Sequence, residues 1–196
     1  MPPTDEDLVE AFRGGELSAF DTLVARWERR IRGAIHRVVG NEDEARDLCQ
    51  ETFLRAYRAL DSFKSEARFS SWLYQIALNL CRDRLRRRRG RTLVSLEDMG
   101  EGAEELAVRR PSAFELVQAR DLARTVAAAI SELAEEQREV IVLKEYQELT
   151  FQEVAEVLGI PVSTVKTRLY RGLGQLKERL ERRGVRRAMP VPATLP

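Results

Sequence analysis

The chain has 196 residues, of which 43% are apolar and 33% charged, with a net charge of +1, as in a globular but strongly hydrated protein. This length allows one domain or two small ones, and two cysteines with one histidine are too few for a Cys/His zinc site. No apolar run is long enough to cross a membrane and no signal peptide is evident, so we expect a soluble, cytoplasmic chain without a cofactor.

Apolar residues recur at steps of three and four residues almost throughout, which predicts an all-α protein. We expect the first part, residues 5–89, to form one small helical domain. Asn41 is expected to cap its third helix with Glu44 completing a capping box, and Cys49 and Cys81 fall in apolar patterns typical of core packing. The expected helices are Asp5–Gly14, Ser18–Val39, a third that follows Asn41 and ends near Leu60, and Phe69–Arg89.

The composition changes at residues 90–112, which contain glycines, a proline and a run of acidic residues typical of a flexible linker. A second small helical domain is expected over 113–184. Residues 185–196, with three prolines, are expected to form a disordered tail. The expected helices of the second domain are Phe114–Ser131, Ala134–Glu145, Thr150–Leu158 and Ser163–Arg183.

Residues 149–180, LTFQEVAEVLGIPVSTVKTRLYRGLGQLKERL, have the features of a helix-turn-helix. Thr150 can cap the first helix with Glu153 three residues later, and Gly159 permits the left-handed conformation that ends it. Pro161 then prevents continuation, and a longer helix follows. A short helix, a turn with glycine and a longer second helix form a common DNA-binding arrangement.

The N-terminal half of that second helix is rich in side chains that can contact bases and phosphates in a major groove. Several of them share one face at helical spacing, although a solvated charged face would look similar. The predicted DNA-contacting residues are Ser163, Thr164, Lys166, Thr167, Arg168 and Arg171.

The last helix of the first domain, FSSWLYQIALNLCRDRLRRRRGR over 69–91, combines an amide, an aromatic group and arginines on one face. Asn79 can pair with a base, Trp72 can stack on an unpaired base, and Arg82 and Arg86 can neutralise phosphate. Gln75 belongs to the same face. Two other interpretations remain open: Trp72 is a core residue, or the seven arginines of 82–91 form a generic polyanion-binding patch.

These two segments, together with DEARDLCQETFLRAYRALDSFKSEARFSSWLYQIALNLCRDRLRRRR over 43–89, resemble the extracytoplasmic-function (ECF) sigma factors of bacterial RNA polymerase. The resemblance covers about residues 5–183. It implies two helical domains, sigma region 2 over 5–89 and sigma region 4 over 113–184. The short linker between them is also typical of this class.

The resemblance further implies partners and roles. Core RNA polymerase and promoter DNA are the expected partners, and an anti-sigma factor is a further candidate. The helix that contacts the polymerase corresponds to Asp47–Ala59, although an ordinary amphipathic surface would have the same pattern. The expected contact residues are Asp47, Gln50, Glu51, Leu54 and Arg55.

In the same way, the loop that holds a flipped base of the −10 element corresponds to Lys64–Ser71, and the −35 reading helix corresponds to Ser163–Gln175. Extruding a base costs a few kcal/mol of stacking, so a pocket must hold it. The predicted −10 residues are Lys64, Arg68, Phe69, Trp72, Gln75, Asn79, Arg82 and Arg86.

The alternatives to a sigma factor are a regulator that acts alone and an enzyme. A stand-alone helix-turn-helix regulator would use the same DNA-binding motif but would not need the polymerase. An enzyme is disfavoured, because the sequence has neither a glycine-rich phosphate loop nor a nucleophile elbow.

Overall fold

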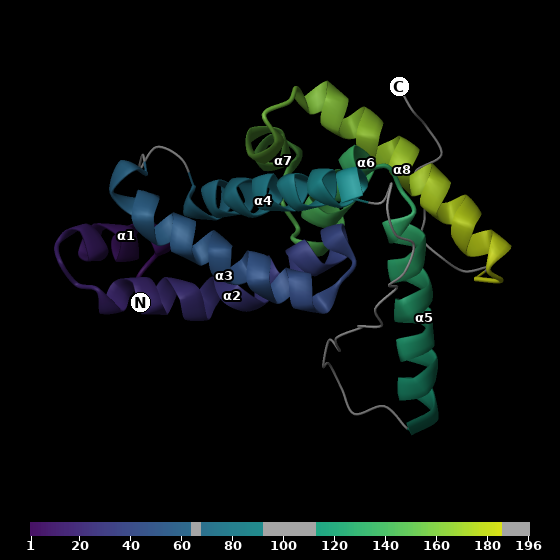
Figure 1. Cartoon of the computed structure of the whole chain (residues 1–196), viewed down its shortest axis with the longest axis horizontal. Coiled ribbons are helices and arrows are strands. Elements are labelled where there is room, and N and C mark those ends of the chain that lie inside the picture. Colours follow the sequence, from purple (N-terminus) through teal and green to yellow (C-terminus); the bar gives the residue numbers. More distant parts are fainter. Residues whose placement is uncertain (64–67, 92–112, 186–196) are drawn as a thin grey trace.

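The structure is a computed structural model that describes residues 1–63, 68–91 and 113–185, with only the backbone described at residues 91 and 113–120. The described residues fold into two helical units that pack against each other (Figure 1). None of the described helices is both long and apolar enough to span a bilayer. The helices of the first unit are α1 (Asp5–Arg13), α2 (Ser18–Val39), α3 (Glu42–Ala59), the 3₁₀ turn η1 (Leu60–Ser62) and α4 (Phe69–Arg91).

The first unit is built around α2, whose apolar stripe is buried against α1, α3 and α4. Leu23, Ile31, Ile35 and Val38 are fully buried there. The helix ends because Gly40 adopts a left-handed conformation with φ 77°, which glycine reaches without steric cost. As expected, Cys49 and Cys81 are buried.

The helix caps of this unit agree only partly with the expectation. The Asn41 side chain caps α3 by accepting a hydrogen bond from the Glu44 amide at 2.9 Å. The expected capping box does not form, because the Glu44 carboxylate faces Arg84 of α4 at 3.3 Å instead. A complete capping box, which was not anticipated, starts α1 at Thr4 and Asp7.

The second unit consists of α5 (Ala113–Ser131), α6 (Glu135–Ile141), the π-helical turn η2 (Val142–Tyr146), α7 (Phe151–Leu158) and α8 (Val162–Arg182). The single helix expected over 134–145 is therefore only partly helical in the α form. Its last turn widens because the Gln147 amide donates to the carbonyl of Val142, five residues back. Glu148 then takes a left-handed conformation with φ 58°.

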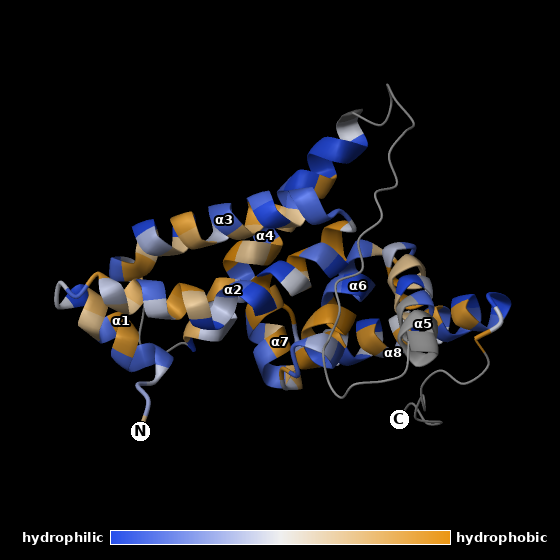
Figure 2. Cartoon of the chain, turned by 90° about the horizontal axis from the view of Figure 1, so that it is seen from below, coloured by the Kyte–Doolittle hydropathy of each residue, from blue (hydrophilic) through white to orange (hydrophobic). Residues whose placement is uncertain are grey.

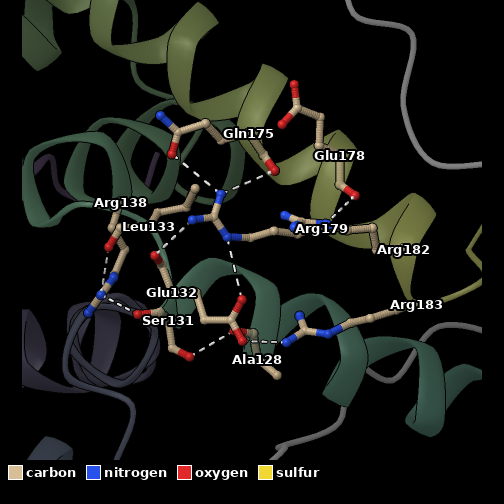
Figure 3. A network of polar contacts seen from close by, with 10 residues as sticks. All are labelled: Ala128, Ser131, Glu132, Leu133, Arg138, Gln175, Glu178, Arg179, Arg182 and Arg183. Carbon is tan, nitrogen blue, oxygen red and sulfur yellow. Dashed lines mark hydrogen bonds and ion pairs between the residues drawn. The ribbon is translucent and has the colours of Figure 1, made fainter.

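The second unit is stabilised by close packing of α6 on α8. Gly172 allows it, since a Cβ at this position would lie 2.9 Å from Cδ1 of Ile141. At the C-terminal end of α8, Glu132 pairs with Arg179 (3.4 Å) and with Arg183 (Figure 3). These contacts attach the α5–α6 connection to the C-terminal half of α8.

Candidate nucleic-acid interface

The helix-turn-helix forms as predicted. Thr150 and Glu153 make a reciprocal capping box at the start of α7, and the amide of Thr150 lowers the pKa of the Glu153 carboxyl. Gly159 is left-handed with φ 65°, and α8 begins at Val162 behind Pro161. Val165, Leu169 and other apolar residues of α8 are buried, so the opposite face of α8 is turned outward.

That outward face carries the residues predicted to read DNA. Ser163, Lys166, Thr167 and Arg171 are exposed, and Thr164 and Arg168 are half-buried. The ammonium of Lys166 lies 5.6 Å from the Phe151 ring, and Lys144 reaches the same ring at 5.3 Å. No local pattern in the sequence indicates this Lys144–Phe151–Lys166 cluster, because its members come from three different elements.

The outer face of α3 is exposed at the positions predicted to contact the polymerase. Asp47, Gln50, Leu54 and Arg55 are exposed, and Glu51 is half-buried and hydrogen-bonded to Arg55 at 2.7 Å. Leu54 retains 43% of its accessible surface, and Tyr57 next to it retains 44%. Large apolar side chains that remain exposed on a charged helix are typical of a protein contact surface.

The start of α4 is organised by an aromatic cluster. Phe69 is fully buried, with its ring 6.0 Å from Phe63 and 5.9 Å from Trp72. Its ring therefore lies in the core rather than on the predicted DNA surface. Trp72 is half-buried, so its side chain packs in this cluster while part of it remains at the surface. Lys64 lies outside the described residues.

The rest of the predicted −10 surface follows α4. Gln75, Asn79 and Arg86 are exposed, and Asn79 accepts a hydrogen bond from Arg82 at 3.1 Å. Beyond residue 82 the helix is almost uniformly hydrophilic (Figure 2). The helix includes Gly90 and ends at Arg91, so it extends into the segment expected to begin the linker; the rest of that linker lies outside the described residues.

Contacts between the two units were not anticipated, and one of them involves Arg82 of the predicted −10 surface. Arg82 makes two hydrogen bonds of 2.7 Å to the carboxylate of Glu139 on α6. These bonds raise the pKa of Arg82, while burial raises the pKa of the Glu139 carboxyl. The hydroxyl of Tyr74 donates to Gln147 at 2.6 Å. Residues 57 and 73 positions apart in sequence give no local pattern that would reveal such pairs.

Comparison with known protein families identifies both units. The model of sigma-70 region 2 matches residues 23–91, and that of sigma-70 region 4 matches residues 123–176. The RNA polymerase sigma-H factor of Pseudomonas aeruginosa is 35% identical over 90% of this chain and 94% of its own length. The ECF RNA polymerase sigma factor SigW of Bacillus subtilis is 36% identical over 88% of this chain and 94% of its own.

Solved structures give the same result. The chain resembles CnrH, solved in complex with the cytosolic domain of CnrY, with a TM-score of 0.69 and 30% identity over 91% of this chain and 97% of that one. It also has the fold of the sigma factor RpoE from Bartonella quintana, with a TM-score of 0.65 and 24% identity over 83% of this chain and 96% of that one.

Proposed function

Because the chain belongs to the ECF sigma factors of bacterial RNA polymerase, we propose that separate helix faces perform the steps by which it directs promoter-specific initiation. The single observation that supports this division is the exposure, in one chain, of an apolar-centred face on α3 and a basic face on α8. The units are assigned as region 2 over 5–89 and region 4 over 113–184, joined by the linker at 90–112.

The outer face of α3 is proposed to bind core polymerase. Leu54 supplies the apolar centre, and Asp47, Gln50 and Arg55 surround it with polar groups. An apolar centre with a polar rim is the usual anatomy of a protein interface. Burying Leu54 on the polymerase would remove its exposed apolar surface from water.

The surface of α4 is proposed to read and open the −10 element. Asn79 and Gln75 supply amides for base edges, Trp72 supplies a face for stacking, and Arg86 neutralises phosphate. Phe69 is assigned a positioning role, because its buried ring supports Trp72. Arg82 belongs to this surface as well, once its contact with Glu139 is released.

The N-terminal half of α8 is proposed to enter the major groove at the −35 element. Arg168 and Arg171 are the candidates for guanine or phosphate contacts, with Thr164 and Thr167 between them. Lys166, held beside Phe151, is placed to contact the backbone of the DNA.

An anti-sigma factor is proposed as a further partner, since the sigma factor RpoE of Bartonella quintana, which has the same fold, was solved in complex with the anti-sigma factor NepR. The site of action is proposed to be the cytoplasm, where the polymerase works. The chain itself is proposed to catalyse no reaction, the chemistry belonging to the polymerase.

Transcription in vitro with core polymerase over a promoter library tests this function. Run-off products are expected from a subset of promoters that share two elements, and only when both chain and core are present. A stand-alone regulator, which the comparisons do not favour, would bind its operator equally well without core. Initiation that is unaffected by sequence at −10 and −35 would contradict the proposal.

A further inference from the structure

Arg13, the last residue of α1, contacts main-chain carbonyls of a segment far away in the sequence. Its Nη2 donates to the carbonyl of Leu60 at 3.1 Å, to that of Asp61 at 3.4 Å and to that of Phe63. Leu60 and Asp61 belong to the 3₁₀ turn η1 that follows α3, and Phe63 is the residue directly after that turn. One side chain of α1 therefore holds the point where the chain leaves α3.

An arginine suits this position for a physical reason. The last carbonyls of a helix have no partner within the helix, and they carry the negative end of its dipole. The planar guanidinium is always charged and has several N–H donors, so it can serve more than one of these carbonyls at once. Arg13 thus caps the end of α3 and η1 from a different helix.

Glu6 of the same helix contacts the start of α4. Its Oε1 accepts a hydrogen bond at 3.4 Å from the amide of Phe69, the first residue of α4. The first amides of a helix lack partners and attract negative charge. Glu6 and Arg13 are separated by about two helical turns, so they share one side of α1. This helix therefore contacts both described ends of the connection between α3 and α4, whose residues 64–67 lie outside the described part of the chain.

The two residues held in this way carry the rings on which Trp72 packs. The ring of Phe63 lies 5.1 Å from that of Trp72, and the ring of Phe69 lies 5.9 Å from it. Both phenylalanines are buried, whereas Trp72 is half-buried. Because close-packed side chains transmit small shifts to their neighbours, a displacement of either phenylalanine would change how the indole lies.

α1 is itself firmly attached to the rest of the first unit. Val9 and Phe12 are buried. The carboxylate of Asp5 accepts from the indole nitrogen of Trp27 at 2.9 Å and pairs with Arg26 of α2. The contacts made by Arg13 and Glu6 thus start from a fixed helix.

We propose that α1 positions Trp72 for promoter opening, through the two ends of the connection between α3 and α4. Arg13 holds Phe63 and Glu6 holds Phe69. The two rings then keep the indole in the orientation in which it stacks on an unpaired base. The inference rests on the proposed function of α4. It gives α1 a part in opening, although no contact of α1 with DNA or polymerase is proposed.

Arg13→Met in the full chain tests the proposal, because methionine keeps the apolar stem and removes the guanidinium. Arg29→Met is the matched control, since it removes the same charge from an exposed position of α2. Arg13→Lys keeps a cation with N–H donors at the position. Each chain is assembled with core polymerase on one promoter of the library that the parent opens. Permanganate reactivity of the −10 thymines measures opening, and a band shift at low temperature measures closed binding.

A second readout follows Trp72 directly. The chain contains two tryptophans, Trp27 and Trp72, so labelling with fluorotryptophan gives two fluorine NMR resonances, which Trp72→Phe assigns. Arg13→Met is expected to shift the Trp72 resonance of the free chain and to leave that of Trp27 in place, because Trp27 contacts the opposite end of α1. A general loss of structure would move both resonances.

In the holoenzyme, Arg13→Met is expected to lower the equilibrium constant for opening about tenfold, as the loss of a hydrogen bond from a charged group can do. Closed binding is expected to match the parent. Arg13→Lys is expected to recover most of the loss, and Arg29→Met is expected to open the promoter as the parent does.

If Arg13→Met should fail to fold, Glu6→Ala tests the other end of the connection, with Glu10→Ala at an exposed position of α1 as its control. Normal opening with an unshifted Trp72 resonance would overturn the inference, while opening by the parent would leave the proposed function standing. Reduced opening with an unshifted Trp72 resonance would overturn it as well. A shifted resonance with normal opening would show that Trp72 does not act in opening, and the inference would fail together with that assignment.

Discussion

The two helices proposed to contact DNA, α4 and α8, differ in what their cations contact. On α4, Arg82 is bound by Glu139 of the other unit, and Arg68 just before the helix is bound by Glu153. On α8, no carboxylate among the described residues pairs with Lys166, Arg168 or Arg171. The cations of α8 proposed to contact the −35 element thus have no ion pair among the described residues, whereas two of the arginines proposed for the −10 element are paired with carboxylates of the second unit.

The largest effect is expected on polymerase binding, for changes on the exposed outer face of α3. Gln50→Arg with Leu54→Arg places two charges on the exposed face of α3, and core binding is expected to weaken about 100-fold or more. Co-purification with core polymerase measures it. Thr22→Arg with Ala25→Arg adds the same charge to exposed positions of α2 and is expected to leave binding intact. Normal core binding by the α3 variant would contradict the assignment.

The next effect concerns α8, where we expect a direct loss. Arg168→Ala or Arg171→Ala should cost about 1–3 kcal/mol and relax specificity at one base pair if that arginine contacts a base. A phosphate contact would instead weaken all sequences alike and reduce the dependence on salt. Binding of polymerase holoenzyme to mutated −35 sites at two salt concentrations separates these outcomes. Lys177→Ala, on the exposed C-terminal half of α8, is the control.

A smaller effect, on DNA opening rather than on initial binding, is expected for α4. Asn79→Ala removes one amide from the proposed −10 surface, and it should impair DNA opening while initial closed binding by the holoenzyme is kept. A bidentate base contact of this kind contributes about 1–3 kcal/mol. Permanganate footprinting of unpaired thymines measures opening, and a band shift at low temperature measures closed binding. Equal thymine reactivity in variant and parent would refute the role of Asn79.

The smallest effect is expected for the cap of α7, the helix that precedes α8 in the helix-turn-helix. Thr150→Ala removes the cap of α7 and should cost about 1 kcal/mol of unfolding free energy. Urea denaturation followed by circular dichroism measures it. Thr125→Ala, at a half-exposed position in the interior of α5, loses a hydroxyl without losing a cap. A cost as large for Thr125→Ala would show that the cap is not what stabilises this region.

Local signals predicted most of the fold. The stripe of α2, the left-handed glycine at 159 and the pair Thr150–Glu153 each act over a few residues, so the sequence displays them directly. Glu44 shows the limit of such signals. Its spacing from Asn41 suited a capping box, but Arg84, 40 residues further on, competes for its carboxylate.

The site was harder to predict than the fold, because several of its contacts join residues far apart in the sequence. Spacing along a helix identified Asn79 and Arg82 as neighbours on one face, and the structure has them hydrogen-bonded. Spacing did not reveal that Glu139 would pair with Arg82, because this ion pair depends on how the two units pack. Phe69 was assigned to the DNA surface from its position in a motif, whereas burial by Phe63 and Trp72 decides its environment.

The two cysteines provide the most direct test of the contact between the two units. Both are buried, and burial raises the pKa of the Cys49 thiol to about 11 and that of the Cys81 thiol still further. Neither thiol is therefore expected to react quickly at neutral pH. Cys81 lies in the field of Glu139 and Arg82, at the contact between the units, whereas Cys49 donates to the carbonyl of Glu28 within the first unit.

The measurement is the rate of N-ethylmaleimide labelling at each cysteine, followed by peptide mass spectrometry, for the parent and for Glu139→Gln. Separation of the units should expose Cys81 and leave Cys49 protected. We predict that Glu139→Gln accelerates labelling of Cys81 alone. Equal rates at Cys81 in parent and variant, with both chains folded, would contradict the claim that the Arg82–Glu139 pair holds the second unit against α4.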